Sequence, residues 1–155
     1  MGNKTLKIIG IVAGAAVVVV GLWLRFMPDK QGASVKQMQV GGQSLAVEVA
    51  DTDFLKQQGL SNRASLAPDS GMLFIYPDQA IRYFWMKDMK FPLDVLWLAG
   101  NRVVGLQENI PIKTNNGQVV RFQSNAPSDM VLEVNAGWIR SQGVKVGDIV
   151  FSKLN

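Results

Sequence analysis

The sequence predicts a mainly β (α+β) fold: a compact antiparallel β-barrel or barrel-like sandwich with two short helices, preceded by one transmembrane helix. Three observations lead to this fold class. Eight or nine short apolar runs follow one another beyond residue 34, separated by turn residues. Two glycine-containing turns join neighbouring runs in the manner of β-hairpins. A single charge-free apolar segment precedes all of them.

Composition sets the outer bounds of the protein. A chain of 155 residues is long enough for one modest domain and an appendage. It contains no cysteine and no histidine, which excludes disulfides, thiolate nucleophiles and zinc–thiolate sites. Acid–base chemistry at neutral pH would fall to a perturbed carboxylate or lysine. We therefore expect no metal and no cofactor, and most enzyme classes become less favoured.

The net charge of +4 is concentrated near the N-terminus. Of 16 basic and 12 acidic residues, four basic and one acidic residue precede Ser34, so the remainder carries 12 − 11 = +1. No basic stripe remains that would follow a phosphate backbone. We expect no nucleic-acid partner.

The apolar segment divides the chain into four parts. We predict a cytoplasmic stub over 1–7, a transmembrane anchor or uncleaved signal over 8–27, a linker over 28–34, and a β domain over 35–155. The charge-free stretch Ile8 to Leu24 follows two lysines, which favours a stub inside the cell and a single-pass membrane protein with its domain outside the cytoplasm.

Two alternatives concern this N-terminal segment. A cleaved signal peptide would yield a secreted protein, but Arg25-Phe26-Met27-Pro28 follows the stretch where a small-x-small site would be needed. Gly10 and Gly14 stand one helical turn apart and could support a weak dimer, although small residues are common throughout this segment.

The first elements of the domain follow from turn and cap residues. Strands over 35–40 and 45–49 flank Gly41-Gly42, a two-residue hairpin turn. Asp51-Thr52 offers an N-cap for a helix over 53–58, and Gly59 ends that helix.

Three strands are predicted in the middle of the chain, over 71–76, 81–87 and 93–98, and a fourth over 103–107. In the second of these, alternate side chains on both faces are largely apolar. We therefore expect 81–87 to be a central strand.

The last elements are a hairpin of 112–114 with 118–122 around Asn115-Asn116-Gly117, a strand over 130–134, a brief helix from Ala136-Gly137 to Gln142, and a strand over 149–152. Asp148 is expected to cap the turn before the final strand.

The region from Gly71 to Leu98 resembles the signature of the DUF192 family of uncharacterised conserved proteins. The resemblance rests on Gly-Met-Leu-Phe at 71–74, Phe-Trp-Met-Lys at 84–87 and Pro-Leu-Asp at 92–94, with further blocks from Val47 to Val150. Ser61 departs from the methionine that usually follows Gly-Leu in this family, and Asp88-Met89 replaces a typical Asn-Thr. The resemblance implies an exported or anchored protein and no established activity.

The candidate ligand-binding residues are Trp85, Lys87, Asp94 and Glu108, which border the Pro92 loop and the neighbouring strand. For Asp94 we favour a structural role, in which its carboxylate accepts amides of the 87–90 loop. Glu133 lies within an apolar strand and could be a buried base, but we expect it on an exposed outer face.

These observations predict a membrane-anchored extracytoplasmic binding or interaction domain, whose partner is a small molecule or an envelope protein. One alternative is a hydrolase or lyase using the carboxylate–lysine cluster, and another is a structural component of an envelope complex. No residue is assigned a catalytic role, because neither a Ser-x-x-Lys pair nor a histidine base is present.

Overall fold

The computed structural model describes residues 33–152, which form one compact unit. The predicted stub, the anchor over 8–27, Gly10 and Gly14 lie outside the described residues. Within 33–152, neither helix has the length and apolar character that spanning a membrane requires.

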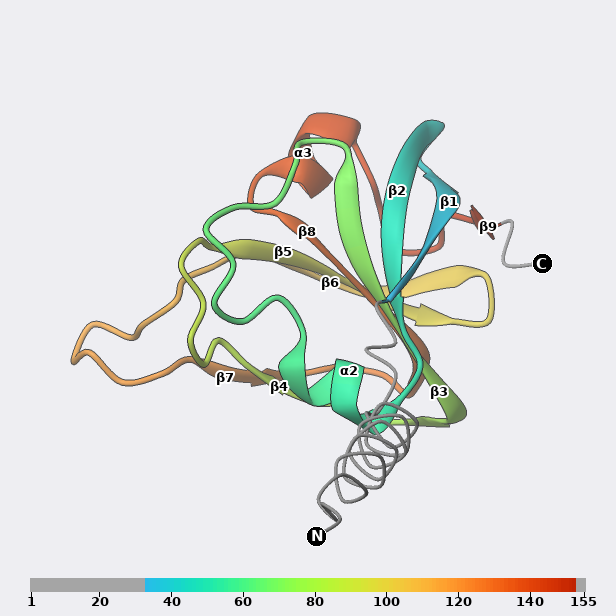
Figure 1. Ribbon diagram of the computed structural model, residues 1–155. Helices are drawn as coiled ribbons and strands as arrows, with labels where there is room; N and C mark the ends of the chain where they lie inside the picture. Colours follow the sequence, from blue (N-terminus) through green and yellow to red (C-terminus); the bar gives the residue numbers. More distant parts are fainter. Residues whose placement is uncertain (1–32, 153–155) are drawn as a thin grey trace, which may run out of the picture. The chain divides into compact units, whose positions relative to one another are not determined.

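A seven-stranded sheet forms most of the domain (Figure 1), with two short helices and a small two-stranded ribbon beside it. Its strands in spatial order are β6 (Arg102–Ile110), β5 (Leu93–Ala99), β8 (Ser128–Asn135), β3 (Ser70–Ala80), β2 (Gln43–Ala50), β1 (Ser34–Val40) and β9 (Val150–Ser152). The prediction of a mainly β, barrel-like domain with two short helices is thereby confirmed.

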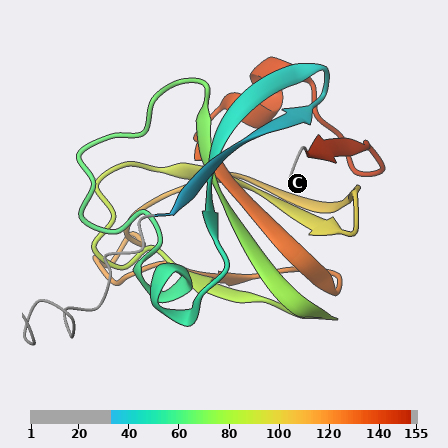
Figure 2. The same cartoon turned by 45° about the vertical axis from the view of Figure 1, so that its right-hand side comes forward.

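The sheet curls into a half-barrel, which is evident when the molecule is turned (Figure 2). Its two outermost strands are linked through the chain just before β9, where Ile149 bridges to Arg102 at the start of β6. The amide of Val103 donates to the Asp148 carbonyl at 3.0 Å, and the amide of Val150 donates to the Asn101 carbonyl at 2.8 Å. These bonds cover part of the edge that an open sheet would leave unpaired.

The prediction of an antiparallel sheet is wrong at one pair of strands, so the sheet is mixed. β2 and β3 run parallel, with Val47 beside Gly71 and Val49 beside Leu73. A parallel pair needs a long crossover instead of a tight turn. Residues 51–69, which include α2 (Asp53–Gln58), supply that crossover.

The central strands β5 and β8, and the first half of β3, are largely buried on both faces. Leu73, Leu96 and Leu132 belong to an apolar cluster on the inner face of the curled sheet. Their neighbours Phe74 and Val131 belong to a second cluster on the outer face. Strands that are buried on both sides are apolar at nearly every position, as β5 is.

The predicted central strand over 81–87 is not central. Only β4 (Tyr83–Trp85) forms there, and it pairs with β7 (Arg121–Gln123) in the separate two-stranded ribbon. Phe84 points inward, with its ring centroid 5.1 Å from that of Phe74, whereas Tyr83 is 74% exposed and Trp85 is 44% exposed. Apolar residues on both faces of this segment therefore reflect surface aromatic rings, not burial on both sides.

The predicted hairpin over 112–122 is reduced to a single bridge between Lys113 and Val119, because 121–123 pairs with β4 instead. The predicted caps of the two helices and of the last turn are confirmed. Thr52 caps α2 by accepting the Leu55 amide at 3.3 Å. α3 (Trp138–Gln142) lies between two glycines in the left-handed conformation, and Asp148 accepts the Lys145 amide at 2.8 Å.

Asp94 is fully buried at the start of β5, and its carboxylate accepts two backbone amides as predicted. The donors differ from those expected. They are Asn109 in β6 at 2.7 Å and Ile139 in α3 at 2.9 Å, not the 87–90 loop. A bulge sets two β6 residues opposite Asp94, and Asn109 adopts φ 53° there. The carboxylate thus holds both the bulge and the start of α3 in place.

Replacing Asp94 should destabilise the domain far more than replacing Lys87. We expect Asp94→Ala to lower the free energy of unfolding by about 1–3 kcal/mol, because two buried amides lose their acceptor. Lys87→Ala should change it by no more than about 0.5 kcal/mol, since Lys87 is an exposed side chain. Urea melts of the two variants measure both values, and a neutral Asp94→Ala would contradict the structural role.

Candidate functional site

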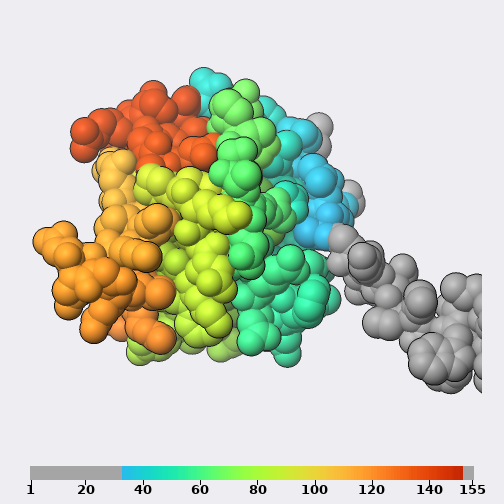
Figure 3. All heavy atoms as spheres, turned by 60° about the vertical axis from the view of Figure 1, so that its left-hand side comes forward, coloured from blue at the N-terminus to red at the C-terminus, as the bar shows by residue number. Residues whose placement is uncertain are grey.

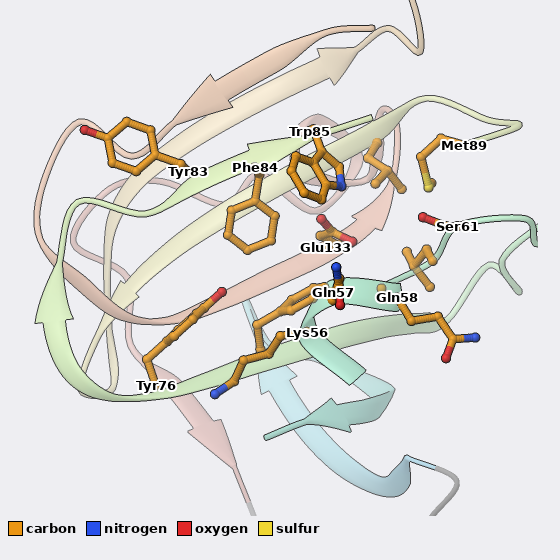
Figure 4. A pocket seen from close by; sticks show the side chains of 14 residues that line it. Lys56, Gln57, Gln58, Ser61, Tyr76, Tyr83, Phe84, Trp85, Met89 and Glu133 are labelled. Carbon is orange, nitrogen blue, oxygen red and sulfur yellow. The ribbon is translucent and has the colours of Figure 1, made fainter. Parts of the chain in front are cut away.

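A cavity of about 250 Å³ lies on the outer face of the sheet, between α2 and β4. α2 and the turn after it form one wall, β4 forms the opposite wall, and β3 and β8 form the floor (Figure 4). The same face is seen in Figure 3, where α2 and the turn after it in green border residues of the eighties in yellow-green. Aromatic side chains form the largest group in the lining, and leucine and methionine side chains add to its apolar surface. The remaining lining residues are Lys56, Gln57, Gln58, Gly59, Ser61 and Glu133.

Two hydrogen bonds join the walls at one end of the cavity. The Ser61 hydroxyl donates to the Lys87 carbonyl at 2.9 Å, and the Asn62 amide donates to the Asp88 carbonyl at 2.8 Å. Asn62 and Asp88 both adopt positive φ, which asparagine and aspartate tolerate better than most residues. Gly59, also at positive φ, lies against the Phe74 ring. These contacts fix the two walls of the cavity relative to each other.

Glu133 lies at the floor of this cavity, and only 5% of it is exposed. It sits in β8 between Met72 of β3 and Val95 of β5, on the face covered by the aromatic ribbon. Burial raises the pKa of its carboxyl to about 8. Among residues 33–152, none of the three ion pairs includes it, and no hydrogen bond of the described part reaches its carboxyl.

The expectation that Glu133 is exposed is wrong. The alternation of β8 does place it on the outer face, together with Val131. That face is not open to solvent, because α2 and the β4–β7 ribbon cover it. Alternation along a strand identifies the face of a side chain but not what lies above that face.

Tyr76 forms the part of the cavity nearest to the basic residues. The Lys56 ammonium lies 4.7 Å from the centroid of its ring, and the Arg82 guanidinium lies 4.0 Å from it. Burial raises the pKa of the Tyr76 hydroxyl, the charge of Arg82 lowers it, and that of Glu133 raises it further. The cation–π contact holds Lys56, the basic residue that lines this cavity, over an aromatic ring.

The four candidate residues from the sequence do not share one cavity. Trp85 lines the cavity. The Lys87 side chain is exposed, and only the Lys87 carbonyl takes part, as the acceptor of the Ser61 hydroxyl. Asp94 faces the inner side of the sheet. Glu108 lies at the surface, with a carboxylate oxygen 3.6 Å from the Arg140 side chain.

The sequence did not reveal Lys56, Tyr76 and Phe84 as cavity residues. For Glu133, it led us to favour an exposed position over a buried one. One signal was available for Glu133, because an acidic residue flanked by valines and a leucine in a strand is unusual. No comparable signal marks the other three, since lysine and aromatic residues are common at helix surfaces and in strands.

The arrangement favours binding over covalent chemistry. At neutral pH a carboxyl with a pKa of about 8 is mostly protonated and can donate a hydrogen bond or release its proton. The Ser61 hydroxyl is engaged with the Lys87 carbonyl and has no activating base beside it. In residues 33–152 no group of three or more acidic side chains could hold a metal ion.

Comparison with known proteins identifies relatives but no activity. The sequence model of the DUF192 family, described as an uncharacterized ACR, matches residues 36–151. A crystal structure from Sinorhizobium meliloti 1021, of a protein named as a candidate transcription regulator, is 29% identical with a TM-score of 0.70. The match covers 79% of this chain and 97% of the chain in that structure.

A second solved structure has no assigned function. It is a protein from Novosphingobium aromaticivorans DSM 12444 that is 27% identical, with a TM-score of 0.65, and it covers 76% of this chain and 82% of its own. No curated protein matches the chain.

The buried carboxyl should make stability depend on pH. The folded pKa of Glu133, about 8, lies above its value of 4.5 when exposed, so the folded state holds the proton more tightly. The contribution of this proton binding to the free energy of unfolding is fully present below pH 4.5. It is lost as the pH rises to 8, at about 1.4 kcal/mol per pH unit. Glu133→Gln should remove that slope.

Urea melts of both proteins between pH 5 and 9 measure the difference, because all other titrating groups are shared. Equal slopes for the two proteins would contradict the raised pKa of Glu133.

Proposed function

Because this chain belongs to the DUF192 family, whose description assigns no activity, we propose from the geometry of the cavity that the domain binds a small molecule between α2 and β4. The observation that supports this proposal is the burial of the Glu133 carboxyl at the floor of the cavity. A carboxyl buried among aromatic rings without a partner lowers the stability of a fold. Groups of that kind are commonly retained where a ligand completes their hydrogen bonds.

The shape of the cavity supports the same conclusion. Its walls are joined by the Ser61 and Asn62 hydrogen bonds, so little ordering is needed when a ligand enters. Its volume of about 250 Å³ lies just below the roughly 300–1,000 Å³ usual for ligand pockets. A small, largely apolar molecule with one or two polar groups therefore fits this site best.

We place the ligand in this cavity and not at the carboxylate–lysine cluster that a hydrolase or lyase would use. Both carboxylate oxygens of Asp94 accept backbone amides, which leaves that side chain committed to the fold. Lys87 is exposed to solvent, and Glu108 faces Arg140.

Nucleic acid is a less suitable partner, although one relative carries the name of a regulator. Residues 33–152 hold 11 basic residues, which are the 16 of the chain without Lys4, Lys7, Arg25, Lys30 and Lys153. They also hold 11 acidic residues, the 12 of the chain without Asp29, so the formal charges of this part of the chain cancel. Binding to a phosphate backbone depends on an excess of basic side chains.

We further propose that this binding domain is displayed outside the cytoplasm on a membrane anchor. The support is the charge-free stretch Ile8 to Leu24 with Lys4 and Lys7 before it, and the lack of a small-x-small site after it. A small molecule or an envelope protein is then the accessible partner.

A ligand in the cavity should protect the domain against heat only when the aromatic wall is intact. In a thermal-shift screen of residues 34–155, we expect hits that raise the melting temperature by several degrees. Trp85→Ala should abolish that increase, because Trp85 lines the cavity. Phe151→Ala is the matched control, since Phe151 is an exposed aromatic residue outside the cavity. Hits that survive Trp85→Ala would place binding elsewhere.

The membrane topology is tested separately. A reporter fused after Asn155 should be active only outside the cytoplasm, because the lysines of the stub favour a cytoplasmic N-terminus. A reporter active inside the cell would overturn the orientation. A mature protein shortened to near Ser34 would show instead that the segment is a cleaved signal.

A further inference from the structure

We propose that the ligand of this cavity is a small organic cation, whose ammonium group pairs with Glu133 while its body packs among the aromatic rings. This inference rests on the proposed binding function and adds the chemical class of the ligand.

The first argument is the charge of the lining. Among the residues around the cavity, Glu133 is the single acid and Lys56 is the single base. The two do not form an ion pair, because the Lys56 ammonium lies over the Tyr76 ring. The cavity therefore contains an acid whose natural counter-ion is held away from it. A cationic ligand can supply that counter-ion.

The second argument is the aromatic surface around the acid. Figure 4 shows the rings of Phe84 and Trp85 on one side of the Glu133 carboxyl and the Gln57 side chain on the other. The faces of aromatic rings carry partial negative charge and attract cations, most strongly when water is excluded. Tyr76 already binds two protein cations in this way.

Other ligand classes use less of this surface. An anion would meet the partial negative charge of the rings and, once Glu133 ionises, a second negative charge. A neutral alcohol could accept a hydrogen bond from the protonated carboxyl but would gain nothing from the charge distribution of the rings. The cation is the class that uses both the acid and the rings.

Binding should release a proton. An ammonium group beside Glu133 favours the ionised carboxylate, so the protonated carboxyl gives its proton to the solvent as the ion pair forms. The other titratable groups that face the cavity are Lys56 from α2, Tyr76 from β3 and Tyr83 from β4. Arg82 also lies against Tyr76. None of these needs to change its charge for the exchange to occur.

Three probes with the same phenyl ring and similar size separate the ligand classes: benzylammonium, benzyl alcohol and benzoate. Calorimetry with the full-length protein in detergent at pH 7.5 should show benzylammonium binding at least about tenfold more tightly than the other two. In buffers of different ionisation enthalpy, the apparent enthalpy of benzylammonium binding should reveal the released proton. Its affinity should rise between pH 6.5 and 8.

Two variants test the roles of the charged residues. Glu133→Gln keeps the shape and the hydrogen-bonding capacity of the side chain, so it should retain benzyl alcohol binding and lose the preference for benzylammonium. Lys56→Met removes the positive charge that lines the cavity, which repels a cationic ligand, and should strengthen benzylammonium binding severalfold.

The outcomes are distinguishable from those of the general binding proposal. Equal or tighter binding of benzyl alcohol or benzoate, or a cation preference that persists in Glu133→Gln, overturns the cation while leaving the cavity as a binding site. If benzylammonium does not bind but screening hits still depend on Trp85, the cation is again overturned and the binding function stands. If no ligand raises the melting temperature in a manner that depends on Trp85, both proposals fail.

Discussion

The burial of β5, β8 and the first half of β3 on both faces is the constraint on which the rest of this domain depends. The inner face closes around the first apolar cluster, and the bridge from Ile149 to Arg102 links the ends of the curled sheet. The outer face would expose Phe74 and Trp97 if nothing covered it. The crossover that contains α2 and the β4–β7 ribbon provide that cover. The parallel pairing of β2 and β3 belongs to the same solution, since only a long crossover can both join parallel strands and reach over the outer face.

Two acidic residues on neighbouring strands illustrate what this double burial means for polar groups. Asp94 of β5 pairs with Val134, and Val95 pairs with Glu133 of β8, so the two acids are adjacent in register but face opposite sides of the sheet. On the inner side, backbone amides from β6 and α3 satisfy Asp94 completely. On the outer side, the covering elements leave a cavity above Glu133 and no donor for its carboxyl in the described residues. The first acid is therefore part of the fold, and the second is the strongest candidate for function.

The two departures from the family pattern lie together at this cavity. Ser61 and the Asp88-Met89 pair are separated by 27 to 28 residues in the sequence. In the structure Ser61 contacts the carbonyl of Lys87, the amide of Asn62 donates to Asp88, and both Ser61 and Met89 line the cavity. Two positions that are distant in the sequence and that depart from the pattern of the resemblance therefore meet at one cavity wall.

The sequence by itself determined the local elements of this protein, because their signals are local. Gly41-Gly42 specifies the first hairpin, Thr52 and Gly59 bound α2, and the apolar run from Leu93 to Leu98 specifies a strand. It also determined the family and the absence of histidine and cysteine chemistry. Only the tertiary structure decided which strands are central, what covers the outer face, and which groups meet above β8. The apolar pattern of 81–87 is equally compatible with a central strand and with a surface ribbon. Likewise, the alternation of β8 gives the face of Glu133 but not its environment. Both depend on contacts between residues far apart in the sequence, and no local pattern encodes those contacts.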